Sequence, residues 1–195
     1  MTTPLPADAE TLFARLRDSL KDALGVSCNG LAQGGADAPN ACSGAAPSGG
    51  EDAPAFIGIH TGGAWLAARL HAELGLSSPL GFLSSAFYRD DVQARGLSMR
   101  MQPTRIDFDV NGRDIVLVDD ILHTGRTIRA ALNEIFDYGR PARVRLAVLI
   151  DRGERELPVQ PDHVGTRLVL QPGEKLALSQ RTNGMFELRV ETVQA

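Results

Sequence analysis

Apolar and polar residues alternate with a helical period near the start of the chain. Across residues 8–24, large apolar side chains recur every three or four positions, at Leu12, Phe13, Leu16, Leu20 and Leu24. This spacing predicts an amphipathic helix. Residues 28–53, in contrast, are rich in Gly, Ala, Ser, Asn and Pro and offer too little apolar surface to offset the entropy of ordering them. We therefore predict a single domain, residues 1–195, that carries a disordered insertion at residues 28–53.

From Phe56 onward, short apolar runs alternate with helical segments. Strands are predicted in "FIGIH", "LGFLSSAFY", "DIVLVDD" and "RVRLAVLI", and helices from Ala64 to Gly75 and from Thr127 to Gly139. Strands that alternate with helices indicate right-handed crossovers. The expected fold is therefore α/β, with an open, mainly parallel twisted sheet flanked by helices. The tail from Val164 to Val193 predicts a small antiparallel C-terminal part.

Two connections in this pattern stand out. The sequence "IDFDVNGRDIVLVDD", residues 106–120, predicts a hairpin that turns at Asn111-Gly112 before a buried strand. The polar stretch "RDDVQARGLSMRMQPTR", residues 89–105, is longer than ordinary loops. Loops of this length without secondary structure are usually lids or disordered, so we expect a flexible lid here.

Composition and charge narrow the class of protein without naming its function. The chain has 195 residues and a formal net charge of −4, which does not indicate nucleic-acid binding over the whole surface. No apolar run approaches the length of a membrane span, and the start lacks the features of a signal peptide. We therefore expect a cytoplasmic protein with no membrane segment. The only cysteines, Cys28 and Cys42, lack metal or disulfide spacing and are expected to be reduced.

The stretch "IVLVDDILHTGRT", residues 115–127, carries the clearest chemistry. An apolar strand ends at Asp119 and Asp120, and a helix is expected to begin near Thr127. The loop between them then lies at the carboxyl end of a parallel strand, where ligands of open α/β sheets bind. Gly125, hydroxyl groups and a helix N-terminus suit a phosphate.

A simpler interpretation of this stretch also exists. Thr124 or Thr127 would only cap the helix, and the acids would only solvate the end of the strand. However, two carboxylates beside a phosphate would repel it unless they served hydroxyl groups or a cation. A sugar phosphate with Mg²⁺ supplies both. Neither the G-x-x-x-x-G-K-[ST] nor the G-x-G-x-x-G nucleotide motif occurs in the chain.

At these residues the chain resembles the type I phosphoribosyltransferases, whose motif for 5-phosphoribosyl 1-diphosphate (PRPP) is an apolar strand, two acids and a T-G-x-T loop. The stretches "FYRDD" (87–91) and "RPARVRLAVLIDRGERELPVQPDHVG" (140–165) resemble one branch of that family. Members of this branch combine uracil phosphoribosyltransferase activity with regulation of pyrimidine biosynthesis genes. The resemblance extends from about Phe56 to Gly165 and more weakly along the first helix.

The resemblance implies a role for each part of the site. Asp119 and Asp120 would hold the ribose hydroxyls, directly or through water on Mg²⁺. The 5-phosphate would be wrapped by Thr124, Gly125, Arg126 and Thr127. The diphosphate would meet the loop formed by His60, Thr61, Gly62 and Gly63, although the glycines could also simply make a tight turn. Arg89 in the lid would reach the diphosphate, unless it is a solvated loop residue. The base would be recognised by Asp151, Arg152, His163 and Val164, where His163 takes the place of an aromatic residue. Trp65, in contrast, is expected in the core.

Two positions depart from the family pattern. The diphosphate loop often carries an arginine, whereas this chain has Gly62 followed by Gly63. Glu154 replaces a histidine of the "DRGHREL" sequence found in members that bind messenger RNA. A carboxylate near RNA phosphates lowers affinity by repulsion. These two departures therefore bear on turnover and on RNA binding, respectively.

Three functions remain open on the sequence. The leading expectation is an enzyme that converts uracil and PRPP to UMP and diphosphate with Mg²⁺, coupled to regulation through a pyr messenger RNA leader. The second is a sensor of UMP or PRPP with little turnover. The third is a purine phosphoribosyltransferase, because the PRPP motif is shared across bases. The resemblance also implies a homodimer or a higher homo-oligomer.

Overall fold

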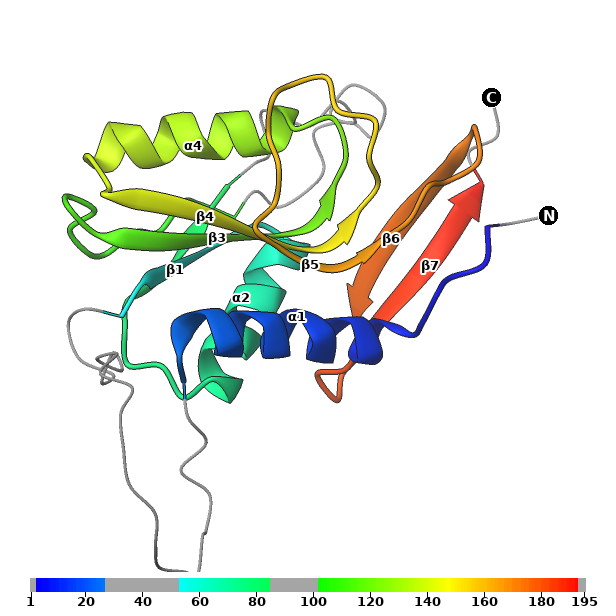
Figure 1. Cartoon of the computed structure of the whole chain (residues 1–195), viewed down its shortest axis with the longest axis horizontal. Coiled ribbons are helices and arrows are strands. Elements are labelled where there is room, and N and C mark those ends of the chain that lie inside the picture. The colour runs from blue at the N-terminus through cyan, green and yellow to red at the C-terminus, as the bar shows by residue number, and fades with distance from the viewer. Residues whose placement is uncertain (1–2, 27–52, 85–101, 193–195) are drawn as a thin grey trace, which may run out of the picture.

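The computed structural model describes residues 3–26, 53–84 and 102–192 (Figure 1). Helices and strands alternate through its central part, and two strands follow at the C-terminal end. In chain order the elements are α1 (Ala9–Leu24), β1 (Ala55–Ile59), α2 (Gly62–Glu73), β2 (Leu80–Leu83), β3 (Asp114–Leu122), α4 (Arg126–Tyr138), β4 (Arg143–Asp151), β5 (His163–Arg167), β6 (Glu174–Gln180) and β7 (Phe186–Thr192).

The main sheet of the described residues has five strands in the order β2-β1-β3-β4-β5. All of its neighbouring strands pair in parallel. From β1 the chain passes to β2 on one side, and β3 lies on the other side. The carboxyl ends of β1 and β3 therefore form the topological switch point, where open α/β sheets bind their ligands.

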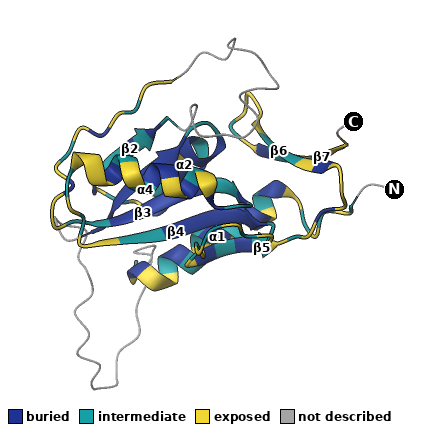
Figure 2. Cartoon of the chain, turned by 90° about the horizontal axis from the view of Figure 1, so that it is seen from above, coloured by how far each residue is buried: buried dark blue, intermediate teal, exposed yellow. Residues whose placement is uncertain are grey.

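Helices cover both faces of this sheet. In Figure 1, α1 and α2 lie below the sheet and α4 lies above it. The strands in the middle are buried, whereas the helices expose their outer faces (Figure 2). The α1 residues that the sequence places on an apolar stripe are all buried: Leu12, Phe13, Leu16, Leu20 and Leu24. The prediction of an α/β fold with a mainly parallel sheet flanked by helices is confirmed.

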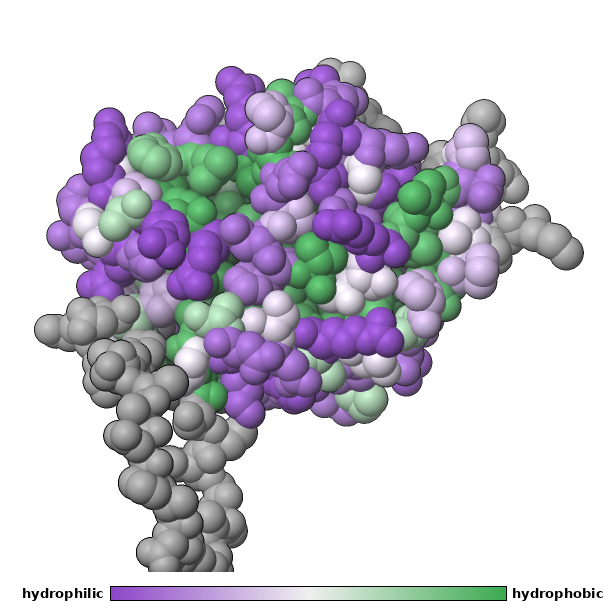
Figure 3. All heavy atoms as spheres, viewed as in Figure 1, coloured by the Kyte–Doolittle hydropathy of each residue, from purple (hydrophilic) through white to green (hydrophobic). Residues whose placement is uncertain are grey.

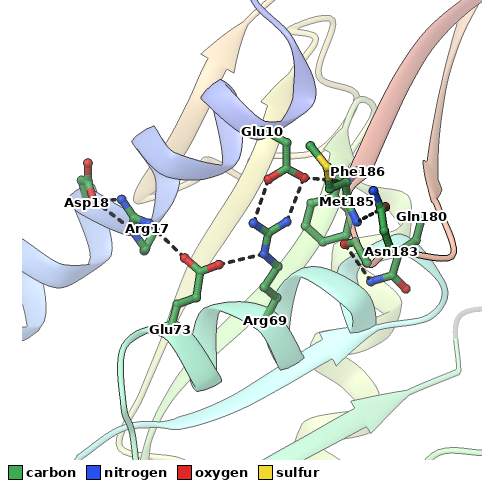
Figure 4. Close-up of polar contacts among 10 residues, drawn as sticks. Glu10, Arg17, Asp18, Arg69, Glu73, Gln180, Asn183, Met185 and Phe186 are labelled. Atoms are coloured by element: carbon green, nitrogen blue, oxygen red, sulfur yellow. Dashed lines mark hydrogen bonds and ion pairs between the residues drawn. The ribbon is translucent and has the colours of Figure 1, made fainter.

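A charged cluster joins α1, α2 and the β6–β7 hairpin (Figure 4). The guanidinium of Arg69 on α2 donates to both carboxylate oxygens of Glu10, at 2.8 and 2.7 Å, and to Glu73 at 2.8 Å. Glu10 also accepts the backbone N–H of Phe186 at 2.6 Å. Arg69 further lies 4.3 Å from the ring centre of Phe13 and 5.1 Å from that of Phe186. This cluster holds the C-terminal hairpin against the two helices.

The predicted hairpin at Asn111-Gly112 is wrong. A turn forms there, but residues 106–110 are not a strand. The carboxylate of Asp109 accepts the backbone N–H of Asn111 at 3.0 Å, and such local side-chain bonds compete with strand pairing. Gly112 instead donates its N–H to the carbonyl of Arg140 at 2.8 Å, which links the turn to the α4–β4 connection.

The C-terminal part differs from the prediction in one strand. The tail from Val164 to Val193 was expected to form a small antiparallel unit, but β5, which contains Val164, pairs in parallel with β4. Gly165 explains how β5 fits here: a Cβ on it would lie 2.6 Å from the carbonyl oxygen of Leu149 and 2.9 Å from that of Leu12. Among the named strands of the described residues, β6 and β7 alone pair antiparallel, so the small antiparallel sheet is confirmed but is shorter than expected.

Element boundaries agree to within a few residues elsewhere. β3 continues two residues past the acid pair to Leu122, and α2 begins at Gly62 rather than Ala64. The insertion at 28–53 lies outside the described residues except for Ala53, as do Cys28 and Cys42, and so do Arg89 and most of the expected lid. In the part of the chain that is described, no helix is both long and apolar enough to cross a membrane.

The surface is mostly polar but carries apolar patches. Figure 3 shows such patches along α4 and over the β6–β7 sheet. Four large apolar side chains are exposed among the described residues: Phe136, Tyr138, Val169 and Met185. They give the molecule apolar surface outside the core.

Candidate functional site

The acid pair lies at the carboxyl end of the central strand β3. Asp119 is only 3% exposed, and Asp120 is partly buried. The N–H of Asp120 donates to Oδ1 of Asp119, and the N–H of Ile121 donates to Oδ1 of Asp120, each at 3.0 Å. The local backbone therefore orients both carboxylates.

On one side of the acids, α2 begins in direct contact with β3. A Cβ on Gly62 would lie 2.2 Å from Oδ2 of Asp120, and a Cβ on Gly63 would lie 2.4 Å from the carbonyl oxygen of Val118. The glycines are therefore required by this close approach and do more than make a turn. At Gly62 the contacting atoms belong to the Asp120 side chain, so a side chain at residue 62 would require Asp120 to move. The N-cap residue Thr61 makes no side-chain capping bond, so its hydroxyl does not cover the helix start.

On the other side, the β3–α4 loop (residues 123–125) leads into a second helix start. Gly125 is the N-cap of α4 and has a φ of 91°, which a glycine adopts without strain. It provides no side-chain cap, and the hydroxyl of Thr124 accepts the N–H of Arg126 only at a long 3.4 Å. Thr127 does not cap the helix, since it lies inside the first turn. The interpretation that these threonines merely cap α4 is therefore not supported, and the first-turn N–H groups suit an anion.

Arg126 lies at the entrance of this helix start. Its guanidinium donates to Glu156 at 2.7 Å, and both side chains are about half exposed. His123 in the same loop lies 3.0 Å from the carboxylate of Glu154. Two acidic side chains of the β4–β5 loop (residues 152–162) therefore face the β3–α4 loop, and sequence reasoning did not foresee their pairing.

The residues expected to recognise the base separate into two groups. Asp151 ends β4 beside Leu122, and the N–H of Arg152 donates to the Leu122 carbonyl at 2.8 Å. Asp151 and Arg152 line a cavity of about 390 Å³ together with Leu168 and Val169. Within the described part of the chain, the buried Nε of Arg152 has no hydrogen-bond partner. Asp151 and Arg152 are thus brought to the β3–α4 loop.

His163 and Val164 are placed differently. The ring of His163 lies on the α1 side of the sheet, where its Nδ1 is 3.0 Å from the hydroxyl of Ser19. Burial lowers its pKa, the charge of Arg145 lowers it further, and Asp162 opposes both effects. Val164 packs on the opposite face into the core beneath α4. The structure does not bring these two side chains to the acid pair.

His60 precedes α2 and faces a different space. The peptide bond between His60 and Thr61 is cis. Burial lowers the pKa of the imidazole, whose ring centre lies 5.6 Å from that of Phe82. His60 and Phe82 line a cavity of about 980 Å³. Trp65 also lines this cavity, and it packs against the core as expected.

Arg155 is the residue of this site that sequence reasoning missed. Its side chain is 19% exposed and pairs with the carboxylate of Asp151. It also donates to the backbone carbonyls of His123 and Gly153, at 2.6 and 2.9 Å. The available signal was an arginine four residues after an acid that ends a buried strand.

The acid pair offers two adjacent carboxylates as oxygen ligands for a cation. Among residues 3–26, 53–84 and 102–192, no group of three or more His, Cys, Asp or Glu side chains is arranged to hold a metal ion. Mg²⁺ is commonly bound through one or two carboxylates together with water and substrate oxygens. The donor set of Asp119 and Asp120 fits that mode of binding.

Comparison with known proteins agrees with this geometry. Residues 44–170 match the model of the phosphoribosyl transferase domain family. The Bifunctional protein PyrR of Nitrosococcus oceani is 56% identical over 128 residues, which cover 65% of this chain and 72% of that protein. The Bifunctional protein PyrR of Ralstonia nicotianae is 56% identical over 127 residues, with the same coverage of 65% and 72%.

Solved structures share the fold. A hypoxanthine-guanine phosphoribosyltransferase from Bacillus anthracis superposes with a TM-score of 0.57 at 16% identity, covering 90% of this chain and 87% of that chain. This identity is too low to transfer a substrate, so the likeness concerns the fold alone. Together with the family match and the two relatives, it shows that the chain belongs to the phosphoribosyl transferase domain family and, within it, to the PyrR proteins, which confirms the expected enzyme class.

Proposed function

We propose that this chain transfers the 5-phosphoribosyl group of PRPP to uracil, which gives UMP and diphosphate. The bond between uracil N1 and C1 of the ribose forms as the bond from C1 to the diphosphate oxygen breaks, and the N1 proton passes to solvent. The observation that carries the proposal is the position of Asp119 and Asp120 between two helix starts that lack side-chain caps. The start of α4 would receive the 5-phosphate of the substrate, and the start of α2 would receive its diphosphate.

The ribose and its phosphates would be held by complementary groups. The Asp119 and Asp120 carboxylates accept hydrogen bonds from the ribose hydroxyls, while N–H groups and hydroxyls of the segment from Thr124 to Thr127 donate to the 5-phosphate. The loop from His60 to Gly63 receives the diphosphate with the backbone N–H groups that follow His60, since the N–H of His60 itself donates to the carbonyl of Leu83 at 2.8 Å. When bound through the acid pair, Mg²⁺ would neutralise negative charge on the diphosphate leaving group. Catalysis then depends on positioning and charge stabilisation.

The base would lie beside Asp151 and Arg152. Uracil offers two carbonyl acceptors and an N3–H donor, which an arginine and a carboxylate complement. Arg152 lines the cavity beside Asp151, which supports a role for its guanidinium as a donor to a base carbonyl. His163 and Val164 contribute to this proposal by fixing β5 next to β4, and Arg89, outside the described residues, would supply a cation to the diphosphate.

A steady-state assay with uracil, hypoxanthine and orotate tests the proposal. UMP and diphosphate should form in equal amounts from PRPP and uracil, and hypoxanthine and orotate should react at least about tenfold more slowly. Preferential use of hypoxanthine would favour a purine enzyme. Saturable binding of PRPP and UMP without product would favour a sensor. Omission of Mg²⁺ should lower the rate.

A regulatory role is the second candidate, because the relatives carry the name bifunctional. We propose that occupancy of the same pocket controls binding of a pyr messenger RNA leader. Glu154 is 62% exposed beside His123, so it would bring a negative charge to that RNA. A gel shift with leader RNA at low and moderate salt decides this, and Glu154→Gln should strengthen any complex. Absence of a shift even at low salt would reject RNA binding.

The assembly state is a separate part of the proposal. The exposed apolar side chains on α4 and near the β6–β7 sheet support the expected homodimer or higher homo-oligomer. Sedimentation velocity across a range of concentrations measures the state directly. A monomer at all concentrations would reject it.

A further inference from the structure

The β3–α4 and β4–β5 loops are joined by backbone hydrogen bonds. The carbonyl of Thr124 accepts the N–H groups of Glu156 and Leu157, at 3.1 and 3.2 Å. The N–H of Arg152 donates to the carbonyl of Leu122 at 2.8 Å. The first loop leads to the proposed 5-phosphate site, and the second borders the proposed base pocket. The two loops are therefore in direct contact.

The guanidinium of Arg155 lies at the centre of this contact. Towards β3 and the β3–α4 loop, Nη1 donates to the carbonyl of His123 at 2.6 Å and to that of Leu122 at a longer 3.4 Å. In its own loop, Nη1 donates to Gly153 at 2.9 Å and Nε donates to Val159 at 3.1 Å. Nη2 pairs with Oδ1 of Asp151, which also accepts the N–H of Gly153 at 2.9 Å. One side chain thus connects β4, its following loop and the loop after β3.

We propose that Arg155 is a positioning residue that fixes the shape of the β3–α4 loop from within the β4–β5 loop, so that the 5-phosphate site and the base pocket act as one unit. This inference rests on the proposed function for its effect on substrates. Arg155 borders the cavity of about 390 Å³ beside Asp151 and Arg152, but its N–H groups are directed to these loop acceptors. It acts through the carbonyls of Leu122 and His123, which precede the phosphate-binding segment.

The geometry of arginine explains why this residue type is needed. Its planar group has five N–H donors in a rigid fork, so it can bind a carboxylate on one side and carbonyls on the other. A lysine keeps the charge beside Asp151 but cannot make all these bonds at once. Loss of the fork leaves buried acceptors unsatisfied, and the two loops are then free to shift relative to each other. A displacement of about 1 Å in a site costs about a hundredfold in rate.

The first test compares Arg155→Gln and Arg155→Lys with Arg140→Gln. Arg140 is a matched control because it also donates to backbone carbonyls, of Phe136 and Gly139, but lies at the far end of α4. Both Arg155 variants should lower kcat/KM for PRPP by roughly tenfold to a hundredfold, mainly through a higher KM, at a temperature where each remains folded. The control should match the wild type. A lysine variant with wild-type KM, or a loss equal to that of the control, would overturn the inference.

A second measurement does not depend on catalysis. Hydrogen–deuterium exchange of the unliganded protein should show faster exchange in peptides covering residues 120–127 and 151–159 of the Arg155 variants, and unchanged exchange there in Arg140→Gln. Unchanged exchange in the Arg155 variants would overturn the inference even if the wild type makes UMP. Faster exchange in a protein whose wild type neither binds PRPP nor makes UMP would support the positioning role and reject the proposed function alone.

Discussion

Arg69 and Arg155 are both largely buried arginines paired with carboxylates, yet they connect different kinds of structure. Arg69 joins side chains of regular elements: it bridges Glu10 and Glu73 (Figure 4). It also stacks on two aromatic rings, those of Phe13 and Phe186. Arg155 bonds mostly to backbone carbonyls of loops at the carboxyl edge of the sheet. An arginine between helices stabilises the fold, whereas an arginine that holds loop carbonyls shapes the site. The difference teaches that the place of the bonding partners in the fold, and not burial, separates a stabilising residue from a functional one.

The largest effect should come from neutralising Asp119 and Asp120, the acids that precede the β3–α4 loop. In the double variant Asp119→Asn and Asp120→Asn, kcat/KM should fall by about 10²–10³-fold, because the ribose hydroxyls and Mg²⁺ lose their anionic partners. The midpoint of urea unfolding should move little, since asparagine oxygens can still accept the local N–H groups. Asp107→Asn is a control on an exposed ion pair. Unchanged affinity of the double variant for PRPP and UMP would place the site elsewhere.

A methyl group at the start of α2 should affect both stability and activity. The Cβ in Gly63→Ala would meet the backbone of Val118 and Asp119 at 2.4 and 2.8 Å, so α2 must move away from β3. We expect a cost of about 1–3 kcal/mol in the free energy of unfolding and about a hundredfold in kcat/KM.

Gly75→Ala is the matched control for this helix. It adds the same methyl group after the other end of α2, where nothing lies within 4 Å and φ is 62°. It should cost about 1 kcal/mol through backbone strain and leave KM unchanged. If both variants had equal kcat/KM, the close approach of α2 to the acids would have no catalytic role.

Removal of the Arg69 fork should lower stability without changing the site. In Arg69→Gln, Glu10 and Glu73 lose their partner and the rings of Phe13 and Phe186 lose a stacked cation, so the free energy of unfolding should fall by about 2 kcal/mol. KM for PRPP should stay at the wild-type value. Arg105→Gln, which breaks an exposed pair with Asp107, should leave the free energy of unfolding near the wild-type value. A higher KM in Arg69→Gln would remove the distinction drawn between the two arginines.

Local patterns in the sequence revealed the acid pair and the helix start that follows it. The acid pair and Gly125 lie within one short stretch, residues 119–125, so the strand that ends and the helix that begins already indicated an anion site beside carboxylates. Gly62 and Gly63 were recognised as a loop, but their contact with β3 required the packing of two elements. The apolar stripe of α1 likewise followed from helical periodicity alone.

Non-local contacts explain what the sequence did not reveal. Glu10 and Arg69 are 59 residues apart, and no periodicity relates them. The alternation around His163 identified a strand but not its partner, so neither the parallel pairing with β4 nor the α1-facing side chain was foreseen. Arg155 was overlooked because its partners are backbone carbonyls, which carry no sequence identity.

The smallest effect is a pH dependence that belongs to the Arg69 cluster. The hydrogen bond from Arg69, followed by that from the Phe186 N–H, lowers the pKa of Glu10 from 4.5 despite some burial. Because the folded pKa is depressed, the stabilisation is present above about pH 4.5 and is lost as the pH falls through the folded value. The difference in unfolding free energy between wild type and Glu10→Gln, about 1 kcal/mol or less, should be constant from pH 8 to 5 and shrink in more acidic urea titrations. In an Arg69→Gln background this acid-dependent difference should shrink to the smaller part that the Phe186 N–H supports; an undiminished difference there would show that Arg69 does not hold the Glu10 carboxylate.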